Sequence, residues 1–304
     1  MEVFSSRKGP SQNIAFISIT TALTLVLSVL ASFVPLSGFF IIIVLPFVSF
    51  TTILLTENKY GVLFLIAAPL LSIAVTAYAF QETLFYIIPS LLTGALFGYL
   101  SKWHFPLAIS FFLSALLSMG LTYLSLPIIK AIYEVDIINF ALSLMGLADN
   151  TLIYNIVPSF IFAISLASLA LAYLFGEVIN EKIHLSRNND DTYSYIYPLC
   201  SVIFASLALG LISILPSYAF IFLAFSLFFA CFSCLLLTGG TKKWLYILLG
   251  VLLLGALIGF VCLYPLYSKE NGLILLSLFS FSIAIPSFIR GLELKKEGKT
   301  SIVR

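Results

Sequence analysis

The sequence predicts an all-α protein, a polytopic bundle of about ten membrane-spanning helices. Its 304 residues are 61% hydrophobic and only 9% charged, whereas a typical soluble domain carries about 25% charged residues. Uncharged apolar runs long enough to cross a hydrocarbon layer of about 30 Å recur along the whole chain. A membrane β-barrel would instead show alternating strands of about ten residues, and the sequence contains no such pattern.

Ten apolar spans are separated by charges, turn residues and prolines. They cover residues 14–35, 38–55, 60–80, 84–101, 106–129, 154–179, 196–214, 217–237, 244–266 and 272–289. The first span follows Arg7 and Lys8 and is too long for the core of a signal peptide, so we expect it to be retained. Residues 35–38 are expected to form a tight turn. Pro46 falls inside the second span and predicts a kink.

Lysine and arginine are distributed asymmetrically over the segments between these spans. If both termini face the cytosol, thirteen of the fifteen basic residues lie on the cytoplasmic side, and only Lys130 and Lys269 lie outside. Basic residues near span ends concentrate on that side of a membrane. Adding or removing one span would move every later charge to the wrong face. We therefore expect a multi-pass membrane protein with both termini in the cytosol.

The chain divides into three predicted parts. Residues 1–180 form a six-helix membrane core, residues 181–195 form a polar cytoplasmic linker, and residues 196–304 form a four-helix membrane region with a basic tail. Within the core, residues 130–149 place apolar side chains at spacings of three and four. This spacing predicts an amphipathic helix on the outer surface.

The distribution of reactive residues argues against several kinds of chemistry. Every Asp, Glu, Lys and Arg is expected at or outside a span end, which removes the usual carriers of proton relays and voltage sensing. The two histidines, His104 and His184, and the four cysteines form no metal-ligand pattern. Phosphate-binding loops, zinc-protease helices and nucleophile elbows are absent from the sequence, and a net charge of +2 does not indicate nucleic-acid binding. We expect no enzymatic activity, no cofactor and no metal site.

Polar residues in the predicted extracellular segments give a candidate solute site. These segments hold five acidic residues against two basic ones, a balance that suits a cationic or hydroxyl-rich ligand entering from outside. The candidate substrate-binding residues are Gln81, Glu82, Tyr86, Asp136 and Asn155. The alternative is that they are ordinary solvated loop residues.

Small residues at helical spacing give a candidate docking face for a partner membrane helix. Small side chains let two helix backbones approach closely. The candidate docking residues are Ser18, Ala22, Ser28, Ser32, Gly94 and Gly98. Gly255 and Gly259 form a further pair of this kind. The alternative is that these faces pack against other helices of the same chain.

Three stretches carry a resemblance to a known family. They are VPLSG at 34–38, ENKYGVLFLIAAPLL at 57–71 and LLTGALFGYLSKW at 91–103. With an N-terminal helix rich in small residues, they resemble the YybS-like (DUF2232-type) family of bacterial membrane proteins. The first six helices of that family resemble the substrate-binding S components of energy-coupling-factor (ECF) vitamin transporters.

The resemblance implies an S-component-like core, and as partners a transmembrane coupling subunit with its ATPases. S components dock their first helix through an AxxxA-type motif, and the matching positions here are only Ser18/Ala22 and Ser28/Ser32. The four C-terminal spans are a further departure from an S component.

Three functions are compatible with these patterns. The leading one is a solute-binding or transporter-related protein whose site opens outward and whose movement is driven by partner subunits. The second is a scaffold that binds other membrane proteins of the cell envelope. The third is a stand-alone ten-helix carrier of the drug/metabolite type, although residues 14–129 and 154–289 show no internal similarity. An occluded polar pocket near Glu82 and Tyr86 would favour the first function, and a filled bundle the second.

Overall fold

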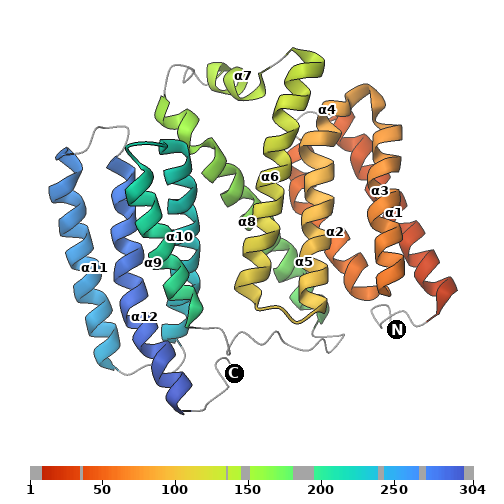
Figure 1. Cartoon of the computed structure of the whole chain (residues 1–304). Helices are drawn as coiled ribbons and strands as arrows, with labels where there is room; N and C mark the ends of the chain where they lie inside the picture. The colour runs from red at the N-terminus through yellow and green to blue at the C-terminus, as the bar shows by residue number, and fades with distance from the viewer. Residues whose placement is uncertain are drawn as a thin grey trace. The chain divides into compact units, whose positions relative to one another are not determined.

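The computed structural model describes residues 9–34, 37–134, 136–144, 151–180, 195–238, 243–266 and 272–297. These residues form helices joined by short turns, with no strand among them (Figure 1). Eight of the helices are long and apolar enough to span a membrane, and the apolar helices Phe40–Leu55 and Ile196–Leu211 are shorter. In order along the chain, these helices correspond to the predicted spans. The protein is an all-α polytopic transmembrane bundle.

The chain divides into two compact units. Unit 1 consists of Met1–Ala141 and Ile161–Asn188, and unit 2 of Leu142–Phe160 and Asn189–Arg304. Helix α8 (Thr151–Asn180) therefore contributes its first part to unit 2 and its remainder to unit 1. The linker expected at 181–195 stays a prediction, because residues 181–194 lie outside the described residues.

Unit 1 is built from consecutive apolar helices joined by short turns. They are α1 (Pro10–Phe33), α2 (Ser37–Leu55), α3 (Asn58–Val75), η1 (Ala77–Ala79), α4 (Phe80–Glu82), η2 (Thr83–Ile87), α5 (Ile88–Lys102), α6 (Leu107–Tyr133) and the first part of α7 (Ile137–Leu144). Pro10 starts α1 at a position where a missing backbone N–H has little cost. The short turns between the long helices give unit 1 two ends, which we name the Glu82 end and the Lys102 end after one residue at each.

The core of unit 1 forms where α1, α2 and α3 meet the start of α5. It contains Ile17, Ala31, Ile41, Leu45, Phe64, Ala68, Ile87 and Leu91. Helices α2 and α5 approach each other most closely at Gly94, where an added Cβ would meet the Pro46 carbonyl oxygen and lie 2.5 Å from Pro46 Cα. A Cβ on Gly98 would lie 2.9 Å from Ile53 Cβ. The glycine pair of α5 is thus used within the chain, against α2.

Unit 2 combines the first part of α8 with four further long helices. They are α9 (Ile196–Leu211), α10 (Pro216–Thr238), α11 (Lys243–Leu263) and α12 (Ser277–Glu297), with the short turns η4 (Tyr264–Leu266) and η5 (Gly272–Leu276) before α12. Ser201 and Ser226 link α9 to α10, because each hydroxyl donates to the other residue's carbonyl oxygen, at 3.1 and 3.0 Å. Small buried residues such as Ala208 and Ala219 allow this close packing.

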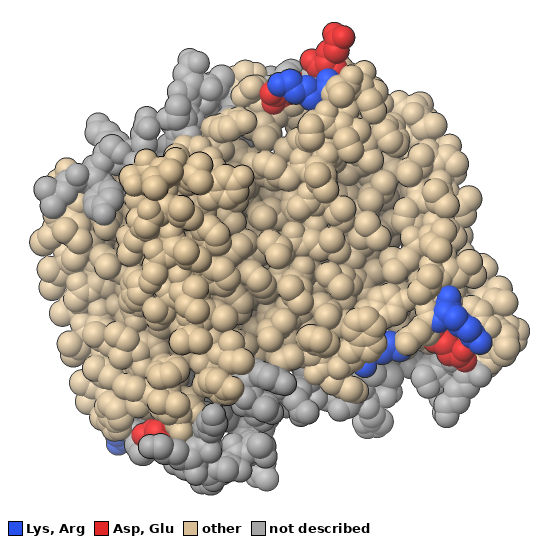
Figure 2. Space-filling model, viewed as in Figure 1, with Lys and Arg blue, Asp and Glu red and all other residues tan. Residues whose placement is uncertain are grey.

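The outward surfaces of these helices are apolar. Phe40 is 71% exposed, and Ile19, Leu124 and Ile247 are similarly uncovered. Most of the face drawn in Figure 2 carries no charged side chain. Large exposed apolar surfaces are unusual for a soluble monomer. They are the expected surface of helices that contact lipid tails.

The structure differs from the prediction of one amphipathic helix over residues 130–149. Helix α6 continues through Pro127 to Tyr133, and Glu134 ends it in the left-handed conformation, with φ 58°. The surface helix α7 begins only at Ile137. Residues 130–133 belong to α6 because Pro127 does not end that helix, which continues without a break from the apolar residues before it. Residues 145–150 lie outside the described residues.

Arg290 is buried within a helix, whereas the sequence predicts it just beyond the end of the last span. Helix α12 continues to Glu297, past the predicted span end at residue 289, so that Arg290 falls within the helix and is only 7% exposed. Its Nη1 atom lies 3.5 Å from Glu293 Oε2, one turn further along. An ion-pair partner makes a buried guanidinium tolerable. Arg290 still lies in the last turn of the spanning segment Gly272–Glu293. The expectation that every charged residue lies at or outside a span end is wrong for Glu82, which lies in the second turn of the spanning segment Ala77–Lys102.

Candidate functional site

The candidate site lies at the Glu82 end of unit 1, where the chain passes from α3 into α5. Helix α3 ends at Val75, and the chain then forms a 3₁₀ turn, the short helix α4 and a π-helical turn over Thr83–Ile87. The sequence predicts a very short turn around Gln81 and Glu82, whereas these two residues are helical. π-Helical turns are rare and occur frequently at functional sites.

Glu82 and Tyr86 lie together at this end. The Glu82 side chain is half-buried and forms no hydrogen bond or ion pair with the residues that the structure describes. Tyr86 follows Glu82 by four residues, so the two side chains lie about one turn apart on the same stretch of helix. The Tyr86 ring packs against the start of α2, since a Cβ on Gly38 would lie 3.0 Å from its Cε2 atom. Phe85 contacts the same ring edge-on, with centroids 4.9 Å apart. Gln81, beside Glu82, is exposed.

A chain of buried hydroxyl groups begins beside Glu82. Thr83 is fully buried, and its hydroxyl hydrogen-bonds that of Thr76. Thr76 Oγ1 also donates to the carbonyl oxygen of Ser72 at 2.6 Å. The Ser72 hydroxyl in turn lies 3.1 Å from the Ser28 hydroxyl on α1. Polar groups therefore extend from the Glu82 end into the interface between α1 and α3.

These hydroxyl groups were not predicted from the sequence as part of the site. A signal was present, because Thr20, Thr24 and Ser28 follow one another at four-residue spacing on α1, as do Ser72 and Thr76 on α3. Such spacing places side chains on one face of a helix. It does not reveal which two faces meet.

Asp136, a predicted substrate-binding residue, caps α7 in the structure. Its Oδ1 atom accepts the backbone N–H of Asn139 at 3.2 Å, which is the usual geometry of a helix N-cap. Its Oδ2 atom accepts from Asn139 Nδ2 at 3.1 Å and from Lys130 Nζ at 3.0 Å. Because three donors already occupy the carboxylate, we leave Asp136 out of the candidate site.

We expect the corner between α6 and α7 to loosen in acid. The Lys130 ammonium, helped by the Asn139 N–H, holds the pKa of the Asp136 carboxyl below its ordinary value of 3.8. A depressed pKa means that the contact stabilises fully above the unfolded-state value and is lost as the pH falls through the folded one. A spin label at the exposed Ser143 should therefore gain mobility as the pH falls below the ordinary pKa of an aspartate carboxyl.

Matched variants test this assignment. Asp136→Asn can still cap the helix but carries no charge, so the acid-induced step in mobility should disappear. Glu134→Gln changes a neighbouring exposed carboxylate and should leave the step in place. A wild-type label whose mobility does not respond to acid would contradict the assignment.

Asn155, the fifth predicted binding residue, has a partner within unit 2. It lies on α8, where its Oδ1 atom accepts a hydrogen bond from Ser217 Oγ at 2.6 Å. This contact joins α8 to the start of α10. Of the five predicted residues, Gln81, Glu82 and Tyr86 therefore remain in the candidate site.

The predicted docking residues of α1 point in different directions. Ser18 and Ala22 are exposed on the surface of unit 1. Ser28 is fully buried, beside Ser72 of α3, and the half-buried Ser32 donates to the Ser28 carbonyl at 3.0 Å. Only the Ser18 and Ala22 positions are open to a partner, since the two glycines of α5 are covered by α2.

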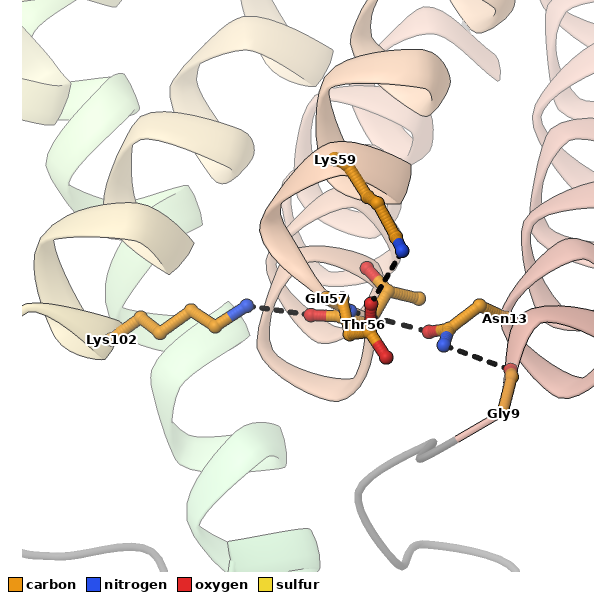
Figure 3. Close-up of polar contacts among 6 residues, drawn as sticks. All are labelled: Gly9, Asn13, Thr56, Glu57, Lys59 and Lys102. Atoms are coloured by element: carbon orange, nitrogen blue, oxygen red, sulfur yellow. Dashed lines mark hydrogen bonds and ion pairs between the residues drawn. The ribbon is translucent and has the colours of Figure 1, made fainter.

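Asn13 joins two segments at the Lys102 end of unit 1 (Figure 3). It is fully buried, and its Nδ2 atom donates to the Gly9 carbonyl oxygen at 3.0 Å. Its Oδ1 atom accepts the backbone N–H of Glu57 at 3.2 Å. The start of α1 is thereby fixed to the turn between α2 and α3.

Lys102 closes the same end from α5 (Figure 3). Its Nζ atom donates to the carbonyl oxygens of Thr56 at 2.6 Å and Ile53 at 3.3 Å, at the C-terminus of α2. Lys59 pairs with Glu57 at 3.2 Å on the surface of this end. These donors and acceptors satisfy one another, so we interpret the Lys102 end as structural. The unpaired carboxylate makes the Glu82 end the better candidate for a binding site.

Comparison with known protein families, curated proteins and solved structures finds no match to this chain. Within the described residues, no three His, Cys, Asp or Glu side chains are grouped so that they could hold a metal ion. A function therefore has to be argued from the residues at the Glu82 end.

Proposed function

We propose that the protein is a solute-binding or transporter-related membrane protein, with its binding site at the Glu82 end. The observation that carries the proposal is the Glu82 carboxylate, which is half-buried and unpaired within the described part of the chain. It lies within an apolar helix, Ala77–Lys102, that is long enough to span a membrane. Ionisable groups in such helices are costly and mark functional sites by default.

The proposal includes an orientation. With both termini in the cytosol of a bacterial cell, thirteen of the fifteen basic residues face inward. The Lys102 end then faces the cytosol, and the Glu82 end faces outward, where a solute can reach it. The proposal also includes the resemblance to the YybS-like family and its S-component-like core.

Movement of a solute would be driven by partner subunits. Apart from Glu82, in the second turn of Ala77–Lys102, the acidic and basic residues of the described spans lie in their first or last turns. The described spans therefore lack the series of ionisable groups that usually carries ion coupling. A coupling subunit with ATPases, as the resemblance implies, would supply the energy. The exposed Ser18 and Ala22 of α1 offer a place for it to dock.

The same face of α1 favours a second candidate function. A membrane scaffold of the cell envelope would use Ser18 and Ala22 to hold other membrane proteins and would bind no solute. The close packing of α2 on α5 at Gly94 fits a rigid scaffold as well as it fits a transporter core.

Mass spectrometry of the purified full-length protein separates the two functions. We expect a small molecule to co-purify with the wild type and to be depleted in Glu82→Gln. Ala22→Phe should lose any partner subunit but keep the small molecule, while Leu23→Phe, at a neighbouring exposed position, should keep both. If envelope proteins co-purify while no small molecule does, the scaffold function replaces the proposed one.

A further inference from the structure

We propose that the solute bound at the Glu82 end is an organic ammonium cation. This inference rests on the proposed function and names the chemical class of its solute. Three features of the site support it: the charge of Glu82, the aromatic rings beside it, and the small number of oxygen ligands.

The charge of Glu82 is not neutralised from within the described residues. Lys130 lies in the last turn of α6, shortly before α7. Its ammonium is already bound to Asp136. A half-buried carboxylate attracts a cation more strongly than one in bulk water, because the local dielectric constant is lower. An anionic solute would be repelled, and a neutral one would leave the carboxylate uncompensated.

Aromatic residues lie within four positions of Glu82 on both sides in the sequence, at Tyr78, Phe80, Phe85 and Tyr86. Tyr86 lies one turn from Glu82 along the helix and contacts Phe85 edge-on. Tyr78, on the turn just before α4, is exposed and lies 5.2 Å from Phe33, centroid to centroid. Ring faces attract alkylammonium groups through their quadrupole. Gly38 leaves room for the Tyr86 ring against α2, which holds the ring in place before a solute arrives.

The ligand set does not suit a metal cation. Calcium needs six to eight oxygen ligands and magnesium a near-octahedral set, usually from several carboxylates or waters. The candidate site residues Gln81, Glu82 and Tyr86 include one carboxylate, and the hydroxyls of Thr76 and Thr83 are engaged with each other. One carboxylate beside aromatic rings is instead a combination that recognises an ammonium group.

The test is titration calorimetry on the purified full chain in detergent, with ethanolamine, choline, tetramethylammonium and benzylamine as probes. The neutral carbon analogue of choline, 3,3-dimethylbutan-1-ol, is the matched control ligand. At least one cation should bind and the neutral analogue should not, and raising the salt concentration should weaken binding. Glu82→Gln should raise the Kd about tenfold or more, and Tyr86→Leu by a smaller factor.

Two further variants guard against misfolding and non-specific effects. Glu82→Asp keeps the charge and should retain binding to within a few-fold, so it replaces Glu82→Gln if that variant does not fold. Glu134→Gln removes an exposed carboxylate elsewhere in unit 1 and should leave the Kd unchanged.

The outcomes distinguish this inference from the proposed function. Equal binding of choline and its neutral analogue, or a co-purifying solute that is neutral or anionic, would overturn the ammonium assignment and leave the solute-binding function standing. Absence of binding by every probe, together with absence of a co-purifying solute, would overturn both.

Discussion

Gly94→Ala is expected to destabilise the protein strongly, although it adds a single methyl group. The new Cβ would meet the Pro46 carbonyl oxygen and lie 2.5 Å from Pro46 Cα and 2.7 Å from the Pro46 carbonyl carbon. These are backbone atoms of α2, which no side-chain rotation can move aside. Overpacking of a well-packed interior costs about 1–3 kcal/mol, and occasionally more. We expect a clear fall in the thermal unfolding temperature of the purified protein.

Other glycines of unit 1 provide a graded control series. A Cβ on Gly98 would lie 2.9 Å from Ile53 Cβ and 3.1 Å from the Phe50 carbonyl oxygen, so Gly98→Ala should destabilise less than Gly94→Ala. Gly120 of α6 has no atom within 4 Å of an added Cβ, so Gly120→Ala should stabilise by about 0.5–1 kcal/mol through helix propensity. Equal unfolding temperatures for the Gly94 and Gly120 variants would refute the close approach of α2 and α5.

The order of apolar spans could be predicted from the sequence because span length and hydropathy are local properties. Their ends were less predictable. An apolar spacing of three and four is the same for a surface helix as for the last turns of a span, so Lys130 was assigned to the surface helix instead of α6. In the same way, the uncharged run ends before Arg290, whereas the backbone of α12 continues to Glu297.

Part of the candidate site could also be predicted, because it depends only on local spacing in the sequence. Glu82 and Tyr86 are four residues apart, so their proximity follows from helical geometry. Asp136 could have been recognised as a helix cap, since it directly precedes Ile137. The contact between Ser28 and Ser72 depends on which helices pack together, and no spacing within one helix contains that information. The same limitation applies to Lys102, whose partners lie more than forty residues away.

Lys102→Met is expected to give a second large loss of stability. The Lys102 ammonium donates to the Thr56 and Ile53 carbonyl oxygens, at the end of α2 where the last carbonyls have no partner within the helix. A cation there also interacts favourably with the negative end of the helix dipole. Methionine fills a similar volume but leaves these carbonyls without their donor, which costs about 1–3 kcal/mol.

Comparison with Lys59 decides whether the charge or the contact matters. Lys59→Met removes a basic residue from the same end, but its pair with Glu57 is solvent-exposed and should contribute little to stability. Lys102→Arg keeps a donor at the end of α2 and should recover part of the stability. We would measure thermal unfolding of all three variants in the same detergent. If Lys102→Met and Lys59→Met lowered the unfolding temperature equally, the loss would reflect net charge alone, and the role of Lys102 in holding α5 against the end of α2 would have to be abandoned.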